Sequence, residues 1–168
     1  MSALTRLSDV LKPWNTAFSN STAISTTVTT VHIIALLWAG GLAIAADRTT
    51  LRALRATADD RRRQLAELGA VHRPVLGFLF VLFVSGVLLA ASDVDTFATS
   101  PVFWVKLTFV ALLLINGAVL QRTEARLRAG DVSDPTAPLW RRLRTSTYAS
   151  LTLWTLTAIT GVVLANVS

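Results

Sequence analysis

Four segments of the chain are long, apolar and almost free of charge, and they constrain the fold more than any other feature. They cover residues 23–46, 74–92, 99–121 and 145–167, and Lys106 is the one Asp, Glu, Lys or Arg residue within them. Each segment can supply the ~20 residues that cross a hydrocarbon core ~30 Å thick. Because lipid offers no partners for backbone polar groups, we expect each segment to be an α-helix.

The composition agrees with a fold embedded in a membrane. Hydrophobic residues make up 52% of the chain and charged residues only 15%, whereas roughly 25% of a soluble domain is charged. We therefore predict an all-α fold, a four-transmembrane-helix bundle that forms a single integral membrane domain over residues 1–168. The lipid bilayer is its main expected partner. The chain has no cysteine, which excludes disulfides and thiolate metal ligands.

Thirteen of the sixteen Lys and Arg residues lie in two of the three connections between these segments. They are Arg48, Arg52, Arg55, Arg61, Arg62, Arg63, Arg73, Arg122, Arg126, Arg128, Arg141, Arg142 and Arg144. The third connection carries Asp93 and Asp95 and no basic residue. The positive-inside rule then places the basic loops in the cytoplasm and both termini outside, N-out and C-out, in a bacterial inner (plasma) membrane. Arginines beside anionic lipid headgroups explain the net charge of +6, so no nucleic-acid partner is expected.

The N-terminal residues have the pattern of a short amphipathic helix. The apolar residues are spaced three or four positions apart, at Leu4, Leu7, Leu11 and Trp14. Pro13 directly precedes the last of them. This spacing predicts an interfacial helix on the outer surface, with Trp14 at the membrane boundary. The alternative is a frayed terminus.

Two of the connections contain further helix signals. Residues 59–68 are strongly charged and favour a helix, which Gly69 is expected to interrupt. Pro74 suits the first turn of the second spanning helix, where its missing N–H is not needed. After the third segment, Glu124 and Arg128 are spaced i, i+4, which supports a helix there.

One histidine and one lysine lie within the spanning segments, His32 in the first and Lys106 in the third. A polar or charged group at membrane depth is costly unless it is paired or wetted, so both are candidates for function. At ~1.5 Å per residue, His32 lies roughly 21 Å and Lys106 roughly 22 Å above the cytoplasmic edge. We therefore predict that they share one depth in the outer half of the membrane. There, an imidazole can ligate iron and an ammonium can satisfy an anionic group.

The second histidine, His72, precedes the second segment and lies about 20 Å from His32 along the membrane normal. Two axial ligands of one haem iron must approach it at nearly the same level. The offset therefore argues against a haem held between the two histidines. Instead, His72 is predicted to form a secondary polar cluster at the cytoplasmic edge with Asp47, Arg48 and Arg73.

Structural roles for the polar residues within the segments also stay open. Lys106 lies about 8 Å from the outer edge and can snorkel to the surface. His32 can hydrogen-bond to a threonine or to a carbonyl group of a neighbouring helix. Asn116, in the third segment, is predicted to hydrogen-bond between helices.

Short motifs along the chain resemble a group of uncharacterised bacterial four-helix membrane proteins. The motifs are VHIIALLWAGG (31–41), DR (47–48), SGVLL (85–89), SPVFWVK (100–106) and NG (116–117). More distantly, the pattern is similar to the membrane domain of copper-resistance D proteins and to the J-type protoporphyrinogen oxidase. The oxidase resemblance implies haem b, with a first-helix histidine and a third-helix lysine as the functional residues, and His32 and Lys106 match these positions. The fuller histidine set of that family is missing here. The copper-resistance resemblance implies metal uptake, but two histidines, one methionine and no cysteine offer few of the soft ligands that Cu(I) prefers.

These observations give two functional hypotheses. In the first, an inner-membrane protein binds haem b or another redox cofactor near His32 and Lys106, with His32 as the ligand of the haem iron. In the second, the chain is a non-enzymatic permease or accessory subunit without a cofactor, in which Lys106 snorkels. The bundle then pairs with a second copy, as a homo-oligomer, or with a membrane partner subunit. The sequence contains no HExxH motif and no phosphate-binding glycine loop, and it leaves open whether the protein is an enzyme.

Overall fold

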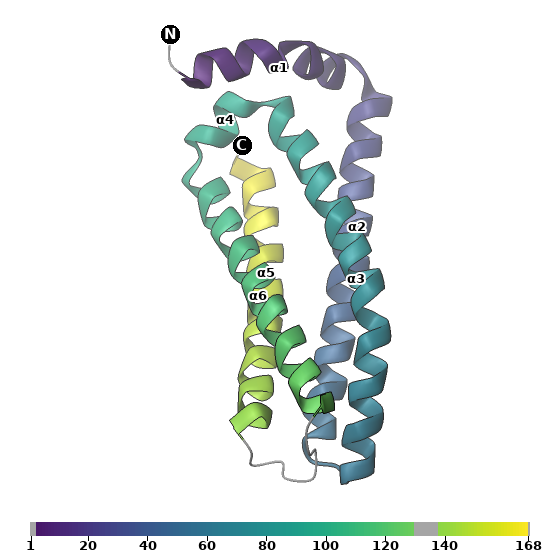
Figure 1. The fold of residues 1–168 in the computed structure, drawn as a ribbon. Helices are drawn as coiled ribbons and strands as arrows, with labels where there is room; N and C mark the ends of the chain where they lie inside the picture. Colours follow the sequence, from purple (N-terminus) through teal and green to yellow (C-terminus); the bar gives the residue numbers. More distant parts are fainter. Residues whose placement is uncertain (1–2, 130–137, 168) are drawn as a thin grey trace.

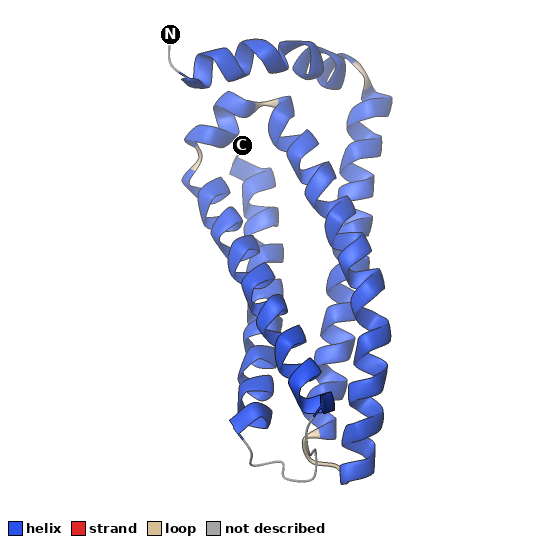
Figure 2. Cartoon of the chain, viewed as in Figure 1, coloured by secondary structure: helices blue, strands red, loops and turns tan. Residues whose placement is uncertain are grey.

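The computed structural model describes residues 3–129 and 138–167, and this part of the chain is helical throughout apart from short turns (Figures 1 and 2). The helices are, in order, α1 (Ala3–Asn20), α2 (Thr22–Ala53), α3 (Ala58–Ser92), α4 (Val94–Thr99), α5 (Pro101–Ala129) and α6 (Pro138–Val167). None of the described residues forms a strand. The predicted all-α fold is therefore confirmed.

Helices α2, α3, α5 and α6 are long and apolar enough to cross a membrane. Each of them exposes large apolar side chains, such as Leu37 (66% exposed), Phe80 (68%), Ile115 (61%) and Val162 (66%). Apolar surface on this scale marks a face that contacts something other than water. The predicted four membrane-length helices are confirmed, and the chain is an integral membrane protein.

The four long helices form two antiparallel hairpins, α2 with α3 and α5 with α6 (Figure 1). The hairpins meet mainly through α2 and α6, whereas α3 and α5 contact one another little. We call the end with the turn at residues 54–57 the loop end; α5 finishes and α6 begins there. The opposite end, with α1, α4 and the C-terminus, is the terminal end (Figure 1).

Local sequence signals explain where several helices begin. Ser21, Thr57 and Asp93 are N-cap residues whose side chains accept hydrogen bonds from the first turns of α2, α3 and α4. Such caps satisfy backbone N–H groups that have no partner within the helix. Ser100 has extended backbone angles, and Pro101 then opens α5, a first-turn position that suits proline.

Helix α3 corrects two expectations, because it runs from Ala58 to Ser92 without the predicted break at Gly69 and without a start at Pro74. Proline removes one backbone hydrogen bond from a helix. Glycine and proline are nevertheless tolerated in membrane helices whose neighbours support the backbone. Helix α2 packs along α3 and provides this support. The first half of α3 is also held by Leu65 and Leu68, which are buried.

Buried side chains are concentrated toward the loop end. One apolar cluster there consists of Leu65, Leu68, Leu127, Trp140 and Leu143. A second, near the middle of the bundle, consists of Ala39, Leu113 and Trp154. A Cβ added to Gly40 would lie 3.3 Å from the Trp154 ring, so glycine permits the close approach of α2 and α6. Nearer the terminal end few side chains are buried, among them Ser85, Thr157 and Leu164.

Helix α1 lies across the terminal end of the bundle (Figure 1). The Trp14 indole N–H donates to the Leu88 carbonyl oxygen at 2.9 Å, and the Ser8 hydroxyl donates to Asp95 at 2.8 Å. The predicted N-terminal helix is thus present, and it continues past Pro13. These bonds attach it to α3 and α4, so residues 3–20 are not a frayed terminus.

Candidate functional site

His32 extends from α2 to α3, where its ring Nδ1 lies 2.9 Å from the Ser85 hydroxyl oxygen. That hydroxyl also lies 2.7 Å from the Val81 carbonyl oxygen. A serine hydroxyl carries one hydrogen, so donation to Val81 leaves its oxygen to accept a hydrogen bond from Nδ1–H of His32. The network therefore assigns a proton to Nδ1, and in the neutral imidazole Nε2 then carries the lone pair.

A glycine lets this histidine lie against α3. A Cβ added to Gly86 would be 3.3 Å from the Cε1 atom of His32, closer than most Cβ contacts. Ser85, the neighbouring residue, is only 3% exposed. The ring of His32 is thus fixed by its hydrogen bond to Ser85, by a further one to the Leu82 backbone and by close contact with α3.

Lys106 occupies a comparable position in the other hairpin. It extends from α5 to α6, where a Cβ added to Gly161 would lie 3.6 Å from its Nζ atom. Its side chain is half-buried, and none of the described residues forms a hydrogen bond with its ammonium group. One turn before Gly161, Thr157 is 4% exposed, and its hydroxyl has no hydrogen-bond partner in the described part of the chain.

The structure brings His32 and Lys106 within electrostatic reach of one another. Each belongs to a different hairpin and contacts the partner helix of its own hairpin at a glycine. The site therefore combines an imidazole lone pair with an ammonium that has no described hydrogen-bond partner. This combination can bind a ligand that offers a metal or a hydrogen-bond donor to the imidazole and an anionic or carbonyl oxygen to the ammonium.

The predicted polar cluster at the cytoplasmic edge is arranged differently. Asp47 is only 3% exposed, whereas Arg48 and Arg73 are exposed and form no ion pair with it in the described part of the chain. The Ser150 hydroxyl lies within hydrogen-bonding reach of the Asp47 carboxyl group. Asp47 thus faces the bundle interior without the two arginines, and the side chain of His72 lies outside the described residues.

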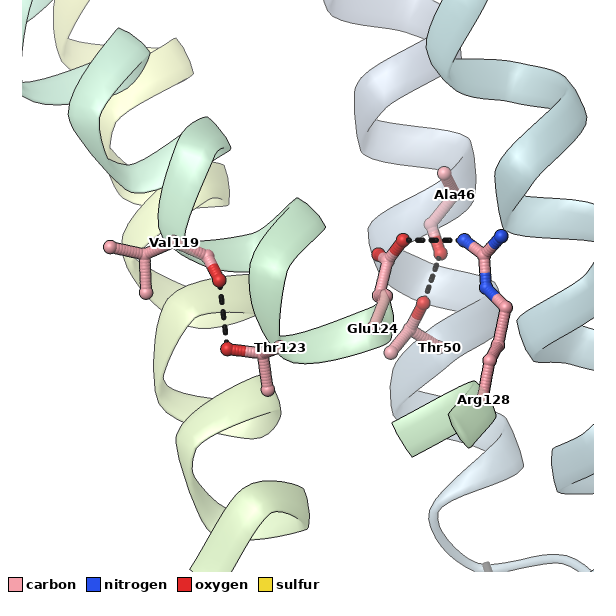
Figure 3. Close-up of polar contacts among 6 residues, drawn as sticks. All are labelled: Ala46, Thr50, Val119, Thr123, Glu124 and Arg128. Carbon is pink, nitrogen blue, oxygen red and sulfur yellow. Dashed lines mark hydrogen bonds and ion pairs between the residues drawn. The ribbon is translucent and has the colours of Figure 1, made fainter. Parts of the chain in front are cut away.

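Sequence reasoning missed the burial of Glu124, which is 0% exposed. Its Oε2 atom lies 3.5 Å from Nη2 of Arg128, and both side chains extend from α5 toward α2, where Thr50 lies (Figure 3). The carboxyl groups of Glu124 and Asp47 also interact electrostatically. The i, i+4 spacing was visible in the sequence, but only extending the third spanning helix past Gln121 would have placed Glu124 beside Asp47.

Two hydroxyl groups beside this ion pair are used within their own helices. Thr50 donates to the Ala46 carbonyl oxygen at 2.9 Å, and Thr123 donates to the Val119 carbonyl oxygen at 2.7 Å (Figure 3). Such bonds are common for threonine inside helices. The two hydroxyls therefore do not compete with Arg128 for Glu124.

Asn116 acts between helices, as predicted. Its side-chain amide donates to the Ser146 carbonyl oxygen at 2.9 Å and so joins α5 to α6. Interhelical hydrogen bonds of this kind hold membrane helices together where the hydrophobic effect contributes little. The prediction of a structural role for Asn116 is confirmed.

Among the side chains that the structure describes, which do not include that of His72, no three His, Cys, Asp or Glu residues form a group that could hold a metal ion. A metal held by protein ligands alone therefore has no candidate position among these described side chains. Haem is different, because its porphyrin supplies most of the iron ligands and needs one protein side chain as axial ligand.

Comparison of the chain with protein-family models, with curated proteins and with solved structures gives no match. Inference about function therefore depends on the geometry of the sites.

Proposed function

We propose that this chain is a four-helix protein of a bacterial inner (plasma) membrane that binds haem b between its two hairpins. His32 ligates the iron, and Lys106 compensates the charge of a haem propionate. The observation that carries this proposal is the pair of unused polar groups, the Nε2 lone pair of His32 and the ammonium of Lys106. They come from opposite hairpins and lie within electrostatic reach of one another.

The residues present fit the group. Histidine ligands of metals usually donate their other ring N–H to an oxygen, which fixes the ring and increases its basicity. Ser85 provides this oxygen for His32. The buried Thr157 hydroxyl without a described partner offers a further hydrogen bond on the α6 side. A flat, largely apolar group also suits the terminal half of the bundle, where few side chains are buried.

Each residue has a separate role in the proposal. Bound haem supplies a one-electron redox couple. His32 holds the iron, Ser85 orients the imidazole, and Lys106 places a positive charge where an anionic group would otherwise be costly in lipid. The resemblance to the J-type protoporphyrinogen oxidase supports this choice of ligand and lysine, and the oxidase reaction itself is not part of the proposal.

An optical spectrum of the protein, purified after expression with ample haem, tests this directly. We expect a Soret band in the wild-type protein and its loss in His32→Ala, because that change removes the iron ligand. Ser85→Ala should keep the ligand but lower haem occupancy, since the ring is then free to rotate. His72→Ala is the matched control and should leave the spectrum unchanged.

A wild-type protein without a Soret band would contradict haem binding. It would favour the second hypothesis, a permease or accessory subunit that works as a homo-oligomer or with a membrane partner subunit. An intact band in Lys106→Met would remove the lysine from the site and assign it to snorkelling at the outer surface.

We further propose an N-out and C-out orientation, with the basic loops in the cytoplasm and α1 at the outer interface. This is supported by the position of α1 and the C-terminus at one end of the bundle (Figure 1) and by the arginines near the other. The chain has no cysteine, so single cysteines report on sidedness cleanly. In intact cells, a membrane-impermeant maleimide should label Thr99→Cys and should spare Ala66→Cys until the cells are permeabilised. The reverse pattern would invert the topology.

A further inference from the structure

A second site lies in the loop half of the bundle, apart from His32 and Lys106. A cavity of about 200 Å³ is lined by all four long helices, and the lining includes Asp47 from α2, Leu79 from α3, Gly117 from α5 and Trp154 from α6. An apolar cavity of ~150 Å³ is known to hold benzene. The space here is therefore sufficient for one substituted ring.

Part of the cavity lining lies at the surface of the bundle, on α3 and α5. Two residues of its lining, Leu76 on α3 and Leu114 on α5, are 52% and 50% exposed. These apolar side chains lie on membrane-length helices, so the surface that they expose faces lipid. Because α3 and α5 contact one another little, a molecule dissolved in the bilayer can enter between them.

Asp47 is the one ionisable side chain among the described residues that line this cavity. It is 3% exposed, and its Oδ2 atom has no hydrogen-bond partner in the described part of the chain. The Ser150 hydroxyl lies within hydrogen-bonding reach of the carboxyl group, but one hydrogen bond does not compensate a carboxylate that is removed from water. The inner end of the cavity therefore presents an acceptor whose hydrogen-bonding capacity is not used.

The surroundings of Asp47 favour a positively charged ligand over a neutral one. Glu124 adds a second carboxyl group within electrostatic reach. Arg128 pairs with Glu124, and no ion pair of Asp47 is seen among the described residues. Trp154 forms part of the wall, and an indole ring attracts cations that lie over its face. Ser150 adds a hydroxyl to the same lining.

From this geometry we infer that the cavity binds a lipophilic amine, a molecule with an apolar ring or chain and a protonated nitrogen, which enters from the bilayer between α3 and α5. The ammonium donates to Asp47, and the apolar part fills the space against Leu79, Gly117 and Trp154. This site does not depend on haem, because neither His32 nor Lys106 is among its lining residues. A charge-assisted hydrogen bond in a largely apolar site is the strongest single contact available to such a ligand.

Calorimetric titration of the full-length protein in lipid nanodiscs tests the inference with three probes of one shape. These are 4-butylbenzylamine, the neutral 4-butylbenzyl alcohol and the anionic 4-butylbenzoate. We expect the amine to bind at least about tenfold more tightly than the alcohol, and the benzoate not to bind. Asp47→Asn should remove the preference for the amine, whereas Asp93→Asn, at an exposed acid of the terminal end, should leave it unchanged.

A second variant covers the case in which Asp47→Asn does not fold. A Cβ at Gly117 would meet nothing within 4 Å, so Gly117→Leu should be accommodated and should fill the cavity, with loss of binding of both amine and alcohol. The inference is overturned if the amine does not bind to the wild-type protein, or if it binds no better than the alcohol. It is also overturned if amine binding is unchanged in Gly117→Leu.

Discussion

The two halves of the bundle are built from the same four helices but are packed differently. In the loop half, large side chains such as Trp140 and Leu143 are 2% and 0% exposed, and Glu124 is buried with them. In the terminal half, α2, α3, α5 and α6 bury few side chains, and His32 and Lys106 each lie against a glycine of the neighbouring helix. The loop half is thus closely packed around the cavity beside Asp47, whereas the terminal half is packed more loosely around His32 and Lys106.

The difference has a physical origin. Membrane helices associate by close packing and by interhelical hydrogen bonds, because lipid is as apolar as the side chains that they could bury. The loop half satisfies both requirements, through its apolar cluster and through Asn116, which joins α5 to α6. The terminal half has the interhelical hydrogen bond between His32 and Ser85 but buries few side chains, which would allow it to adapt to a bound group without disturbing the loop half.

Two leucines on α6 test this comparison most strongly. Leu143→Ala should lower the free energy of unfolding by about 2–5 kcal/mol, because the closely packed loop half cannot collapse around the vacated space. Leu164→Ala, in the terminal half, should cost only ~1–2 kcal/mol, since fewer buried neighbours surround it. Unfolding in mixed micelles by added sodium dodecyl sulfate measures both. Equal losses for the two variants would remove the distinction between the halves.

A smaller effect is expected for the ion pairs at the loop end. Glu124→Gln should destabilise the protein by about 1–3 kcal/mol, because the buried side chain then loses its charge-assisted hydrogen bond to Arg128. Asp59→Asn is the matched control, since the pair between Asp59 and Arg62 is 3.9 Å long and its side chains are 80% and 63% exposed. Its loss should change stability by less than ~0.5 kcal/mol. If Glu124→Gln leaves the free energy of unfolding unchanged, the buried carboxyl group does not stabilise the loop half.

Most of the architecture could be predicted because membrane-length apolar segments admit few folds. The absence of charge from residues 23–46, 74–92, 99–121 and 145–167 was enough to predict four helices. Their ends were not predictable from hydropathy, because the helices continue beyond the apolar part. Helix α3 passes through Gly69 and Pro74, since packing against α2 supports the backbone where local propensity predicts a break.

The candidate sites were predictable only in part. His32 and Lys106 stand out in sequence because lipid makes any titratable group conspicuous. Ser85 and Thr157 do not stand out, since hydroxyl residues are frequent in these helices and most of them bond to their own backbone. Asp47 was assigned to a cluster with neighbouring arginines. Its isolation from them depends on which face of α2 it occupies, and only the packing of four helices determines that.

The hydrogen bonds of α1 have a consequence for the order of events during synthesis. Each long hairpin is made of helices that are neighbours in the chain, so each can form from local contacts soon after its second helix is complete. Helix α1 is made before both hairpins, but its partner Leu88 lies close to the end of the first hairpin and its partner Asp95 lies beyond that end. It must therefore wait, undocked, until both have been translated. Helix α1, which precedes α2, α3 and α4 in the chain, thus reaches its final position after them.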